Sequence, residues 1–416
     1  MHKFIISMIG ARRDYDVAEI LHNENMLERL IIDGYYNTTR YPGLRLFDKI
    51  LPHQIVNTYK KYDPEIAAEK IISSWQTSFK FKAGLYLNKT GDYYKHQIKA
   101  YKALADLAIQ YIKGSGTEET DIYGFDTASV ELFSWVRKNK TNSRLVLEQC
   151  VACRTQQIKM HTLFKQKFGL PNADKMIQHC TQLRERELNE WHLADRILVP
   201  SDFVRKGLAD EGVTDTKIKL VPYGYDSSVD SNIIRKNIDR KHFDKNKRIT
   251  ILFAGNDGYR KGLHDLIDIS AALKDENVIF KIAGKIDLHF VKQISTLENV
   301  VFLGKLSKQQ LIEEYNNADI FFLPSYLEGS ALVTYEAMSW GLPIVTTFES
   351  GSIARDAYDG FIMDAGDKDK MTARLQQLIN DTELRHSMAA NALQTVTNYS
   401  LDNYKNNLLK ILTALN

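Results

Sequence analysis

Glu328 and Glu336 are two carboxylates eight residues apart, within the passage PSYLEGSALVTYEAMSWGLPIVTT at 324–347. The apolar run at 320–323 predicts a strand, so Glu328 falls in the loop at its carboxyl end, where open α/β sheets bind ligands. A helix predicted over 330–340 would carry Glu336 about 8–10 Å beyond its start, at a rise of about 1.5 Å per residue. The spacing therefore presents two hydrogen-bond acceptors along one path.

The start of the same helix is a candidate phosphate site. Gly329 lets the backbone come close to a ligand, and Ser330 is expected to cap the helix. The first helical amides, from Ala331 onward, have no intrahelical partner and lie at the positive end of the helix dipole, where anions bind. A nucleotide sugar on this path would meet Glu328 at its sugar and Glu336 at its ribose, because a carboxylate accepts from both ribose hydroxyls.

Two cations follow another predicted strand. The apolar run 248–254 ends at Gly255, and the loop FAGNDGYRKG presents Arg260 and Lys261. Two cations at the same sheet edge would neutralise a diphosphate and stabilise the charge on a departing one. Solvated surface cations are the alternative, and pairing with the Glu328 loop favours the phosphate interpretation. Backbone groups and hydroxyls that we expect near the phosphate or the base at this edge belong to Gly304, Lys305 and Ser352.

Strand and helix signals alternate through the second half of the chain. Continuous apolar strands separated by helices indicate a parallel sheet covered on both faces. The pattern predicts a doubly wound domain over about 245–395, with Ser307 as the N-cap of one helix. Its strands are predicted at 248–254, 278–283, 299–303, 320–323 and 344–346, and its helices at 263–273, 307–317 and 330–340.

The first half has the same α/β character but is less regular. A helix is predicted over 17–30, and residues 40–113 carry helix and loop signals without a clear strand. The halves join in the charged stretch 223–247, so we expect domains at 1–225 and 245–395, with a last helix at 400–416 returning to the first. Strands are predicted at 4–9, 121–125, 144–147, 195–200 and 217–222, and a helix capped by Ser201 at 202–208.

Segment 58–113 is rich in lysine and in aromatic residues. It holds 10 lysines, no arginine and 5 acidic residues, for a local charge of +5. One interpretation is peripheral contact with anionic lipid headgroups, or with an anionic acceptor. The interpretation that we favour is an ordinary amphipathic helix that packs on the domain through Tyr101, Ala105 and Ala108.

Composition excludes several classes of protein. The 416 residues are 44% hydrophobic and 26% charged, which is ordinary for a soluble globular chain and unlike a disordered, collagenous or disulfide-rich one. Its net charge of only +3 argues against a nucleic-acid partner. Neither a membrane helix nor a signal peptide is indicated, so we expect a cytoplasmic protein. Cys150 and Cys153 have CxxC spacing, but we favour reduced, buried thiols, Cys180 included, over a zinc or redox site.

The arrangement PS-x-x-EG-x6-EA-M-x-x-G-x-P resembles the retaining glycosyltransferases of family four, which have the GT-B fold. Glu328 and Glu336 stand in that family's Glu-x7-Glu spacing, and Lys261-Gly262 matches its Lys-Gly step. The resemblance covers about 190–400 well and the N-terminal part faintly. It extends to VVFLGKLS at 300–307, ADIFFLPS at 318–325, ADRILVPSDFV at 194–204 and KLVPYGYD at 219–226.

The resemblance implies two Rossmann-like, doubly wound domains that face a cleft, and a transferase that uses a UDP- or GDP-sugar without a metal or other cofactor. Glu336 would bind the ribose, and Glu328 would contact the donor sugar near the reaction centre. Arg260 and Lys261 would hold the diphosphate, and the anomeric configuration would be retained. The remaining donor-binding candidates are Gly329, Ser330, Ala331, Gly255, Asn256, Gly304, Lys305 and Ser352.

The chain departs from the family pattern in both halves. Asn256 stands where the family usually has an arginine, and Arg260 is the candidate to compensate. In the N-terminal half, the loop after Gly10 has a single glycine and two arginines, Arg12 and Arg13, which would meet a phosphate or an anionic acceptor, or remain solvated. Asp126 stands where many members place a histidine, and it is the candidate substitute.

We therefore expect a retaining, metal-independent glycosyltransferase that acts on a glycan or lipid-linked acceptor, in the synthesis of bacterial O-antigen, capsule or exopolysaccharide. One alternative is another enzyme of the same fold, such as a sugar-nucleotide epimerase or a phosphorylase. A second is a non-catalytic scaffold that binds a glycan or a partner enzyme. Asn256 and the missing histidine favour the scaffold, whereas the basic, aromatic segment 58–113 favours a transferase with a large acceptor.

Overall fold

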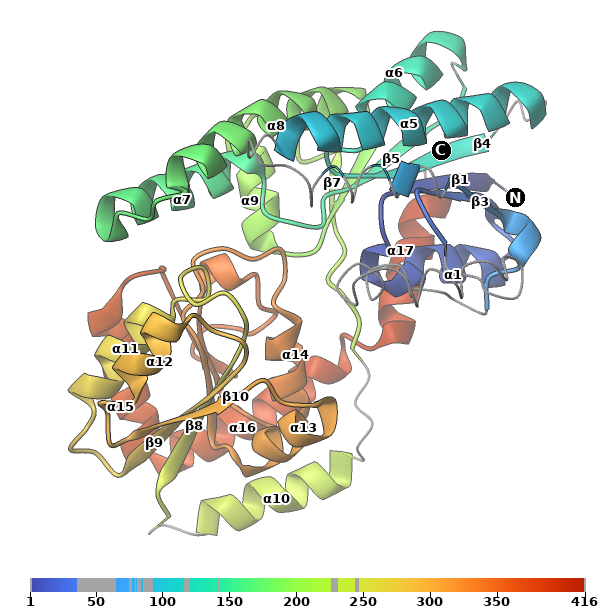
Figure 1. The fold of residues 1–416 in the computed structure, drawn as a ribbon. Coiled ribbons are helices and arrows are strands. Elements are labelled where there is room, and N and C mark those ends of the chain that lie inside the picture. The colour runs from blue at the N-terminus through green and yellow to red at the C-terminus, as the bar shows by residue number, and fades with distance from the viewer. Residues whose placement is uncertain are drawn as a thin grey trace, which may run out of the picture. The chain divides into compact units, whose positions relative to one another are not determined.

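The computed structural model describes residues 2–35, 65–74, 77–78, 80, 84, 93–115, 120–140, 142–225, 231–243 and 247–414. The chain forms two compact units (Figure 1). Unit 1 comprises Met1–Val199, Leu208–Lys219 and Ile411–Asn416, and unit 2 comprises Pro200–Gly207 and Leu220–Lys410. Each unit is built on one sheet with helices on both faces, so the predicted α/β class with two doubly wound, Rossmann-like domains is confirmed.

The sheet of unit 1 has seven strands in the order β3-β2-β1-β4-β5-β6-β7. The order reverses between β1 and β4, so the unit has its topological switch point there. The strands are β1 (Lys3–Met8), β2 (Leu27–Ile32), β3 (Ile71–Ser73), β4 (Thr120–Phe125), β5 (Leu145–Glu148), β6 (Arg196–Val199) and β7 (Ile218–Leu220).

Helices of unit 1 cover the two faces of its sheet. In both views α5, α6 and α8 form the layer on one face, and α1 lies on the other. A long helical hairpin is made by α7 and α8. The helices are η1 (Arg12–Tyr15), α1 (Asp16–Asn23), η2 (Ala68–Lys70), α5 (Tyr93–Ser115), α6 (Val130–Asn139), α7 (Arg154–Phe168), α8 (Ala173–Leu193) and α9 (Asp202–Asp210), which groups with unit 2 as far as Gly207.

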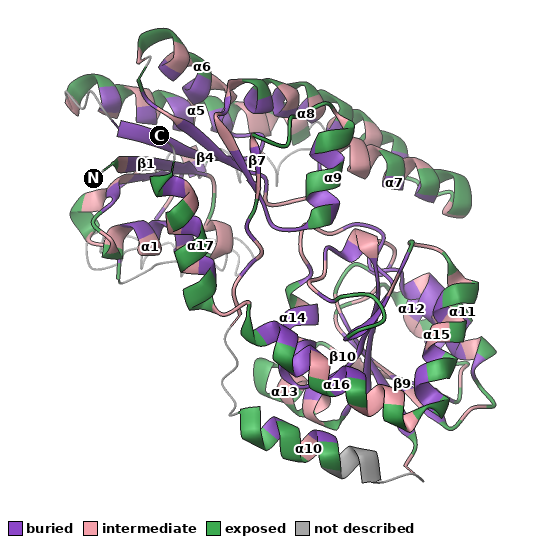
Figure 2. Cartoon of the chain, turned by 180° about the vertical axis from the view of Figure 1, so that it is seen from behind, coloured by how far each residue is buried: buried purple, intermediate pink, exposed green. Residues whose placement is uncertain are grey.

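The sheet of unit 2 has six strands in the order β10-β9-β8-β11-β12-β13, with the switch point between β8 and β11. Its central strands β8 and β11 are buried along their whole length and apolar apart from Thr250, because helices cover both faces, and Figure 2 shows the strands of this sheet buried. The strands are β8 (Ile249–Ala254), β9 (Val278–Ala283), β10 (Val300–Gly304), β11 (Ile320–Leu323), β12 (Ile344–Thr347) and β13 (Gly360–Met363).

Two helical layers enclose the sheet of unit 2. In Figures 1 and 2, α11, α12 and α15 lie on one face and α13, α14 and α16 on the other. The helices are α10 (Ser231–Phe243), α11 (Leu263–Ala272), α12 (Leu288–Ile294), α13 (Lys308–Asn317), α14 (Leu332–Ser339), η3 (Phe348–Ser350), α15 (Lys368–Asn380), α16 (Thr382–Thr397) and α17 (Leu401–Thr413), which continues into unit 1 from Ile411.

The structure differs from the predicted elements in three places. The helix expected over 17–30 ends at Asn23, and Leu27–Ile32 is the strand β2; the chain reverses at Asn25, which adopts a left-handed φ of 56°. A strand, β3, lies within 40–113, where none was expected, and pairs with β2. The charged stretch 223–247, expected to be only a linker, contains α10, whose buried Ile234 and Ile238 belong to the core of unit 2.

Much of the lysine-rich segment 58–113 lies outside the described residues. Its described helix, α5, buries Tyr101, Ala105 and Ala108 against the sheet, so for this helix the amphipathic interpretation is confirmed. Within the described ranges, no helix is long and apolar enough to cross a membrane.

Candidate functional site

The candidate donor site of unit 2 lies at the carboxyl ends of β8 and β11, the two neighbouring strands of the switch point. The loop after β8 carries Arg260 and Lys261, and the loop after β11 carries Glu328. The two loops are tied together by their backbones, because the Tyr326 N–H donates to the Arg260 carbonyl oxygen at 2.8 Å. The expectation that these loops meet at one sheet edge is therefore confirmed.

One oxygen of Glu328 contacts both cations. Glu328 Oε1 lies 2.6 Å from Arg260 Nη1 and 2.6 Å from Lys261 Nζ. The side chains of Lys261, Glu328 and Arg260 are 10%, 13% and 29% exposed, so the ion pairs lie in a largely desolvated place. The solvated interpretation of the two cations is therefore wrong.

Arg260 is held from several sides. Its Nε donates to Asp257 Oδ2 at 2.8 Å, and its Nη1 donates to the Leu327 carbonyl oxygen at 3.0 Å. Burial by itself would lower the pKa of Arg260, but the charges of Glu328 and Asp257 outweigh it and raise that pKa. Its guanidinium is thus a fixed positive charge at the end of β8.

Glu336 lies on α14 and faces α13. Its Oε2 accepts a hydrogen bond of 2.8 Å from the hydroxyl of Tyr315, a buried residue near the end of α13. Burial raises the pKa of Glu336, and the hydrogen bond from Tyr315 opposes that rise. The carboxylate has room for further donors, because each of its oxygens accepts more than one hydrogen bond.

The start of α14 differs from the prediction. The N-cap is Ala331, not Ser330, and α14 begins at Leu332. The Ser330 hydroxyl lies 3.1 Å from the Tyr335 hydroxyl instead of capping the helix. The Ala331 amide, expected to be open to a phosphate, donates to the Ser350 carbonyl oxygen at 3.0 Å, so the first helical amide open by position is that of Leu332.

A third loop, after β12, supports the Glu328 loop. The Glu328 N–H donates to the Glu349 carbonyl oxygen at 2.8 Å. The Ser201 hydroxyl, expected only as a helix cap, also donates to the Gly329 carbonyl oxygen at 2.5 Å. The Ser352 hydroxyl donates to Thr334 Oγ1 at 2.9 Å, so it anchors this loop on α14.

The remaining donor candidates lie at the ends of β8 and β10. Gly255 lies beside the methylene groups of Lys261, which are 3.3 Å from the position of a Cβ on it. The side-chain oxygen of Asn256 accepts from the Lys285 N–H at 2.6 Å, so Asn256 holds the loop after β9. The Gly304 carbonyl oxygen accepts from the Gly284 N–H at 2.8 Å, and Lys305 is exposed.

Sequence reasoning missed a buried contact behind the two cations. The Tyr326 hydroxyl donates to Asp265 Oδ2 at 2.6 Å, and Asp265 is fully buried in the first turn of α11. The hydrogen bond joins the Glu328 loop to the helix that follows Lys261. In the sequence, this contact is signalled locally only by Asp265, an acidic residue four positions after Lys261.

In unit 1 the predicted residues gather at the ends of β1 and β4. The Gly10 N–H donates to Asp33 Oδ1 at 2.8 Å. Arg13 pairs with Asp16 at 2.9 Å and lies 3.9 Å from Glu148. Arg12 is partly buried, and although burial alone would lower its pKa, the neighbouring Asp126 and other negative groups raise it. The arginines are therefore part of a mixed-charge cluster.

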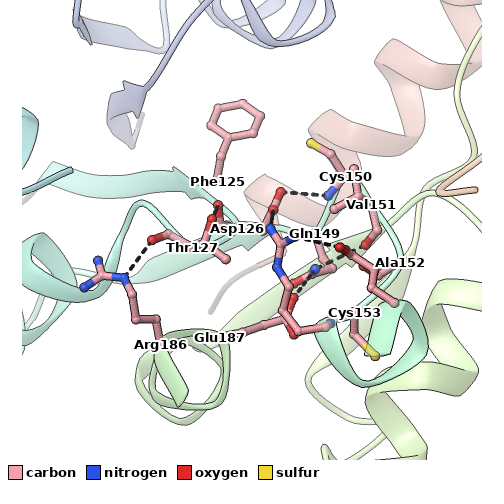
Figure 3. A network of polar contacts seen from close by, with 12 residues as sticks. Phe125, Asp126, Thr127, Gln149, Cys150, Val151, Ala152, Cys153, Arg186 and Glu187 are labelled. Atoms are coloured by element: carbon pink, nitrogen blue, oxygen red, sulfur yellow. Dashed lines mark hydrogen bonds and ion pairs between the residues drawn. The ribbon is translucent and has the colours of Figure 1, made fainter. Parts of the chain in front are cut away.

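Figure 3 shows the other side of this cluster, around the end of β4. The Asp126 carboxylate is 1% exposed; its Oδ1 accepts from the Cys150 N–H at 3.4 Å, and its Oδ2 lies 3.7 Å from Arg154 Nη2. Arg154 begins α7 and, like Cys150, was not expected here. Asp126 is therefore held by groups from the β5–α7 loop.

A buried glutamate of α8 fixes that loop. Glu187 accepts from the side-chain amide of Gln149 at 2.7 Å (Figure 3). It also accepts from the Arg154 N–H at 2.8 Å. Burial raises the pKa of Glu187 to about 7, against the opposing charge of Arg154. One turn further along α8, Glu190 accepts from the amides of Thr127 and Ser129 at 2.6 Å.

The three cysteines are free thiols. Burial raises the pKa of all three, that of Cys153 to about 12, which favours the reduced, protonated form. In the part of the chain that the structure describes, no group of three or more His, Cys, Asp or Glu residues is arranged to hold a metal ion.

Residues 234–395 match the family "Glycosyl transferases group 1". Sulfoquinovosyl transferase SQD2 of Arabidopsis thaliana is 29% identical over 217 residues, which are 50% of this chain and 42% of that protein. The capsular polysaccharide biosynthesis glycosyltransferase CapM of Staphylococcus aureus is 26% identical over 49% of this chain and 57% of CapM. The chain spans about half the length of the curated relatives it matches.

Solved structures show the same fold over the whole chain. HepE of Anabaena, in complex with UDP, has a TM-score of 0.59 at 16% identity and covers 100% of both chains. The lipopolysaccharide outer core galactosyltransferase WaaB has a TM-score of 0.62 at 14% identity, over 100% of this chain and 99% of WaaB. The fold is therefore that of GT-B glycosyltransferases, and residues 234–395 are similar to glycosyl transferases of group 1.

Proposed function

We propose that this chain is a retaining glycosyltransferase that moves a sugar from a UDP- or GDP-sugar to a glycan or lipid-linked acceptor. The observation that carries the proposal is the meeting of Glu328, Arg260 and Lys261 at the switch point of unit 2. A buried lysine, a partly buried arginine and a carboxylate, brought together from two loops, match a ligand with a diphosphate next to a sugar.

Glu336 extends the same site toward a nucleoside. It lies on the helix that starts at the Glu328 loop and keeps a carboxylate that Tyr315 already orients. In the proposed role, it accepts hydrogen bonds from the ribose hydroxyls while the diphosphate reaches Arg260 and Lys261. Asn256 follows β8 itself and Lys305 follows β10, two strands away at the same edge of the sheet, and both are proposed to complete the donor site.

Reaction begins as the bond between the anomeric carbon and the phosphate oxygen breaks, and its electron pair leaves with the nucleoside diphosphate. Arg260 and Lys261 stabilise the charge that develops on that oxygen, so no metal is required in the proposal. The acceptor oxygen then attacks from the face that the phosphate leaves, which retains the configuration. Its proton passes to the departing phosphate.

The N-terminal candidates Gly10, Arg12, Arg13 and Asp126 are proposed to contact the acceptor. Their mixed-charge cluster offers both donors and acceptors of hydrogen bonds, as a polyhydroxyl or phosphorylated acceptor would need. A Campylobacter jejuni relative, 26% identical over 40% of this chain, is named for a diphospho-undecaprenol acceptor. Together with CapM, it supports the proposed role in surface polysaccharide synthesis, to which the proposal adds a place in the cytoplasm, at the inner face of the membrane.

The test is donor cleavage by the full chain. Purified protein is incubated with a panel of UDP- and GDP-sugars, with and without a library of glycan and lipid-linked acceptors, and the released nucleoside diphosphate is measured in the presence of a chelator. We expect acceptor-dependent release that Glu328→Ala abolishes and that Glu313→Gln, an exposed change on α13, leaves intact. No release by the wild type from any donor would contradict the proposal.

The stereochemistry is read from the product. Proton NMR of the new linkage should show the anomeric configuration of the donor, and an inverted product would contradict retention. The same samples separate the alternatives: an epimerase converts the donor without an acceptor. A non-catalytic scaffold, which Asn256 favours because it stands in place of the usual arginine, binds a glycan or a partner enzyme and releases no nucleoside diphosphate.

A further inference from the structure

In this structure, Arg260 and Lys261 hold a protein anion. The same oxygen, Glu328 Oε1, is 2.6 Å from both cations. Any diphosphate that uses these two cations must share or replace that carboxylate. All three residues belong to the proposed donor site. The contact therefore affects which ligands the site binds.

We propose that Glu328 is a specificity-determining internal anion, which occupies the diphosphate-binding cations and makes the site prefer a nucleotide sugar over the free nucleoside diphosphate. The inference rests on the proposed function. It assigns to Glu328 a role toward the phosphate cations in addition to any contact with the sugar. Three features of the site support it.

Arg260 and Lys261 are each held by contacts besides those with Glu328, whereas the Glu328 side chain can rotate about a fixed backbone. Arg260 is anchored by Asp257 and by the Leu327 carbonyl oxygen. The stem of Lys261 packs on Gly255. Glu328 is fixed at its backbone by the Glu349 carbonyl oxygen, so rotation of its side chain is the simplest movement that frees both cations.

Release of the carboxylate costs free energy unless new donors reach it. Glu328 is only 13% exposed, and a largely buried carboxylate without partners is strongly unfavourable. The hydroxyls of a donor sugar, next to the diphosphate, supply hydrogen bonds to the released carboxylate. A nucleotide sugar therefore satisfies both the two cations and Glu328.

A free nucleoside diphosphate satisfies only the cations. It has no hydroxyl groups beyond its terminal phosphate, so the displaced carboxylate stays without donors. Its terminal phosphate also carries more negative charge than the sugar ester, which increases repulsion from the nearby carboxylate. Both effects disfavour the product relative to the substrate, and the return of Glu328 to the cations helps the product leave. Specificity here comes from an unfavourable term against the wrong ligand.

Calorimetry on the full chain tests this inference with four probes: UMP, UDP, UDP-glucose and inorganic pyrophosphate, and the guanosine series in parallel. Glu328→Gln keeps the size of the side chain and removes its charge. We expect UDP and pyrophosphate to bind the variant about tenfold more tightly, equivalent to about 1.4 kcal/mol. UMP should bind within about twofold of wild type, because it lacks the distal phosphate, and the preference for nucleotide sugar over UDP should shrink about tenfold or more.

Two further variants complete the design. Glu313→Gln, an exposed charge change on α13, should alter none of the affinities. Glu328→Ala replaces Glu328→Gln if the latter fails to fold, with the same gain expected for UDP. If UDP binds the Glu328 variants no more tightly than wild type, this inference is wrong while the proposed function stands. If no nucleotide or pyrophosphate binds any form, the donor site itself is wrong, and the inference fails with it.

Discussion

A Cβ atom on Gly262 would lie 1.9 Å from the carbonyl oxygen of Pro324. The loops after β8 and β11 thus touch backbone to backbone, directly behind Lys261 and Glu328. Gly262 also has a φ of +72°, a conformation that costs L-residues about 1–2 kcal/mol. Only glycine meets both conditions, so the approach of the two loops depends on this residue.

We expect Gly262→Ala to lower the stability of unit 2 by roughly 3 kcal/mol or more, because left-handed strain and a backbone clash add. Gly304→Ala is the matched control: Gly304 has a φ of +69°, but nothing lies within 4 Å of its Cβ position, so only about 1 kcal/mol should be lost. Urea unfolding followed by circular dichroism measures both. Equal losses in the two variants would show that the loops do not touch.

The hydrogen bond from Tyr315 to Glu336 predicts a pH dependence of nucleotide binding. Ionised Glu336 accepts stronger hydrogen bonds from the two ribose hydroxyls than a protonated carboxyl does, so affinity should fall as the pH drops through its pKa. Burial raises that pKa and Tyr315 opposes the rise; Tyr315→Phe should therefore move the loss of affinity to higher pH. Between the pKa values of the two proteins, the variant should bind UDP more weakly than wild type by about 0.5–1.5 kcal/mol.

Calorimetry between pH 5 and pH 8 measures this effect. Glu336→Gln serves as the control, because its side chain cannot titrate and its affinity should show no pH step of this origin. Glu336→Ala, which removes the acceptor altogether, should weaken donor binding by roughly 1–3 kcal/mol. If the wild type and Tyr315→Phe give parallel profiles, Glu336 is not the group that titrates.

Tyr326→Phe should destabilise unit 2 by about 1–3 kcal/mol, because it removes the hydroxyl that donates to the fully buried Asp265 and leaves a charged acceptor under-satisfied. Tyr358→Phe provides the comparison, since Tyr358 is 39% exposed and a surface change of this kind is expected to stay within about 0.5 kcal/mol. Thermal unfolding distinguishes the two. A loss for Tyr326→Phe no larger than that for Tyr358→Phe would refute the importance of this contact.

Local signals were sufficient for most of unit 2. The apolar runs of β8, β11 and β12 are buried on both faces and could be predicted directly, and Ser307 caps α13 as expected, with its hydroxyl accepting from the Gln310 amide. Because each strand end could be placed, the loops of Arg260, Lys261 and Glu328 could be brought to one edge. Ser330 failed as a cap because the neighbouring β12 loop binds the Ala331 amide, and such a contact has no local signature.

Unit 1 was harder to predict for a physical reason. The segment Leu27–Ile32 mixes charged and apolar residues, and its strand is specified by pairing with β1 rather than by its own pattern. The cluster around Asp126 is made by groups far apart in sequence: Glu187 reaches the loop after β5 across 33 and 38 residues. Each acidic residue of α8 looks like part of a solvated helix face, and only packing shows which of them is buried.

Glu187 predicts how the stability of unit 1 depends on pH. Its pKa is about 7 in the folded chain, against about 4.3 for an ordinary glutamate in an unfolded chain. Between these values the folded state binds a proton that the unfolded state has lost, so this group lowers stability as the pH rises to 7 and has no further effect above it. Glu187→Gln removes the titration, although it also weakens the contact with the Arg154 N–H. The variant should therefore gain stability relative to wild type as the pH rises from 4.5 to 7.

Urea unfolding at half-unit steps of pH measures the difference in unfolding free energy between the two proteins. The contribution of the buried Glu190 is the same in both and cancels in that difference. Glu185→Gln, an exposed change on the same helix, should give a curve parallel to wild type, and a parallel curve for Glu187→Gln as well would mean that Glu187 is ionised throughout this range.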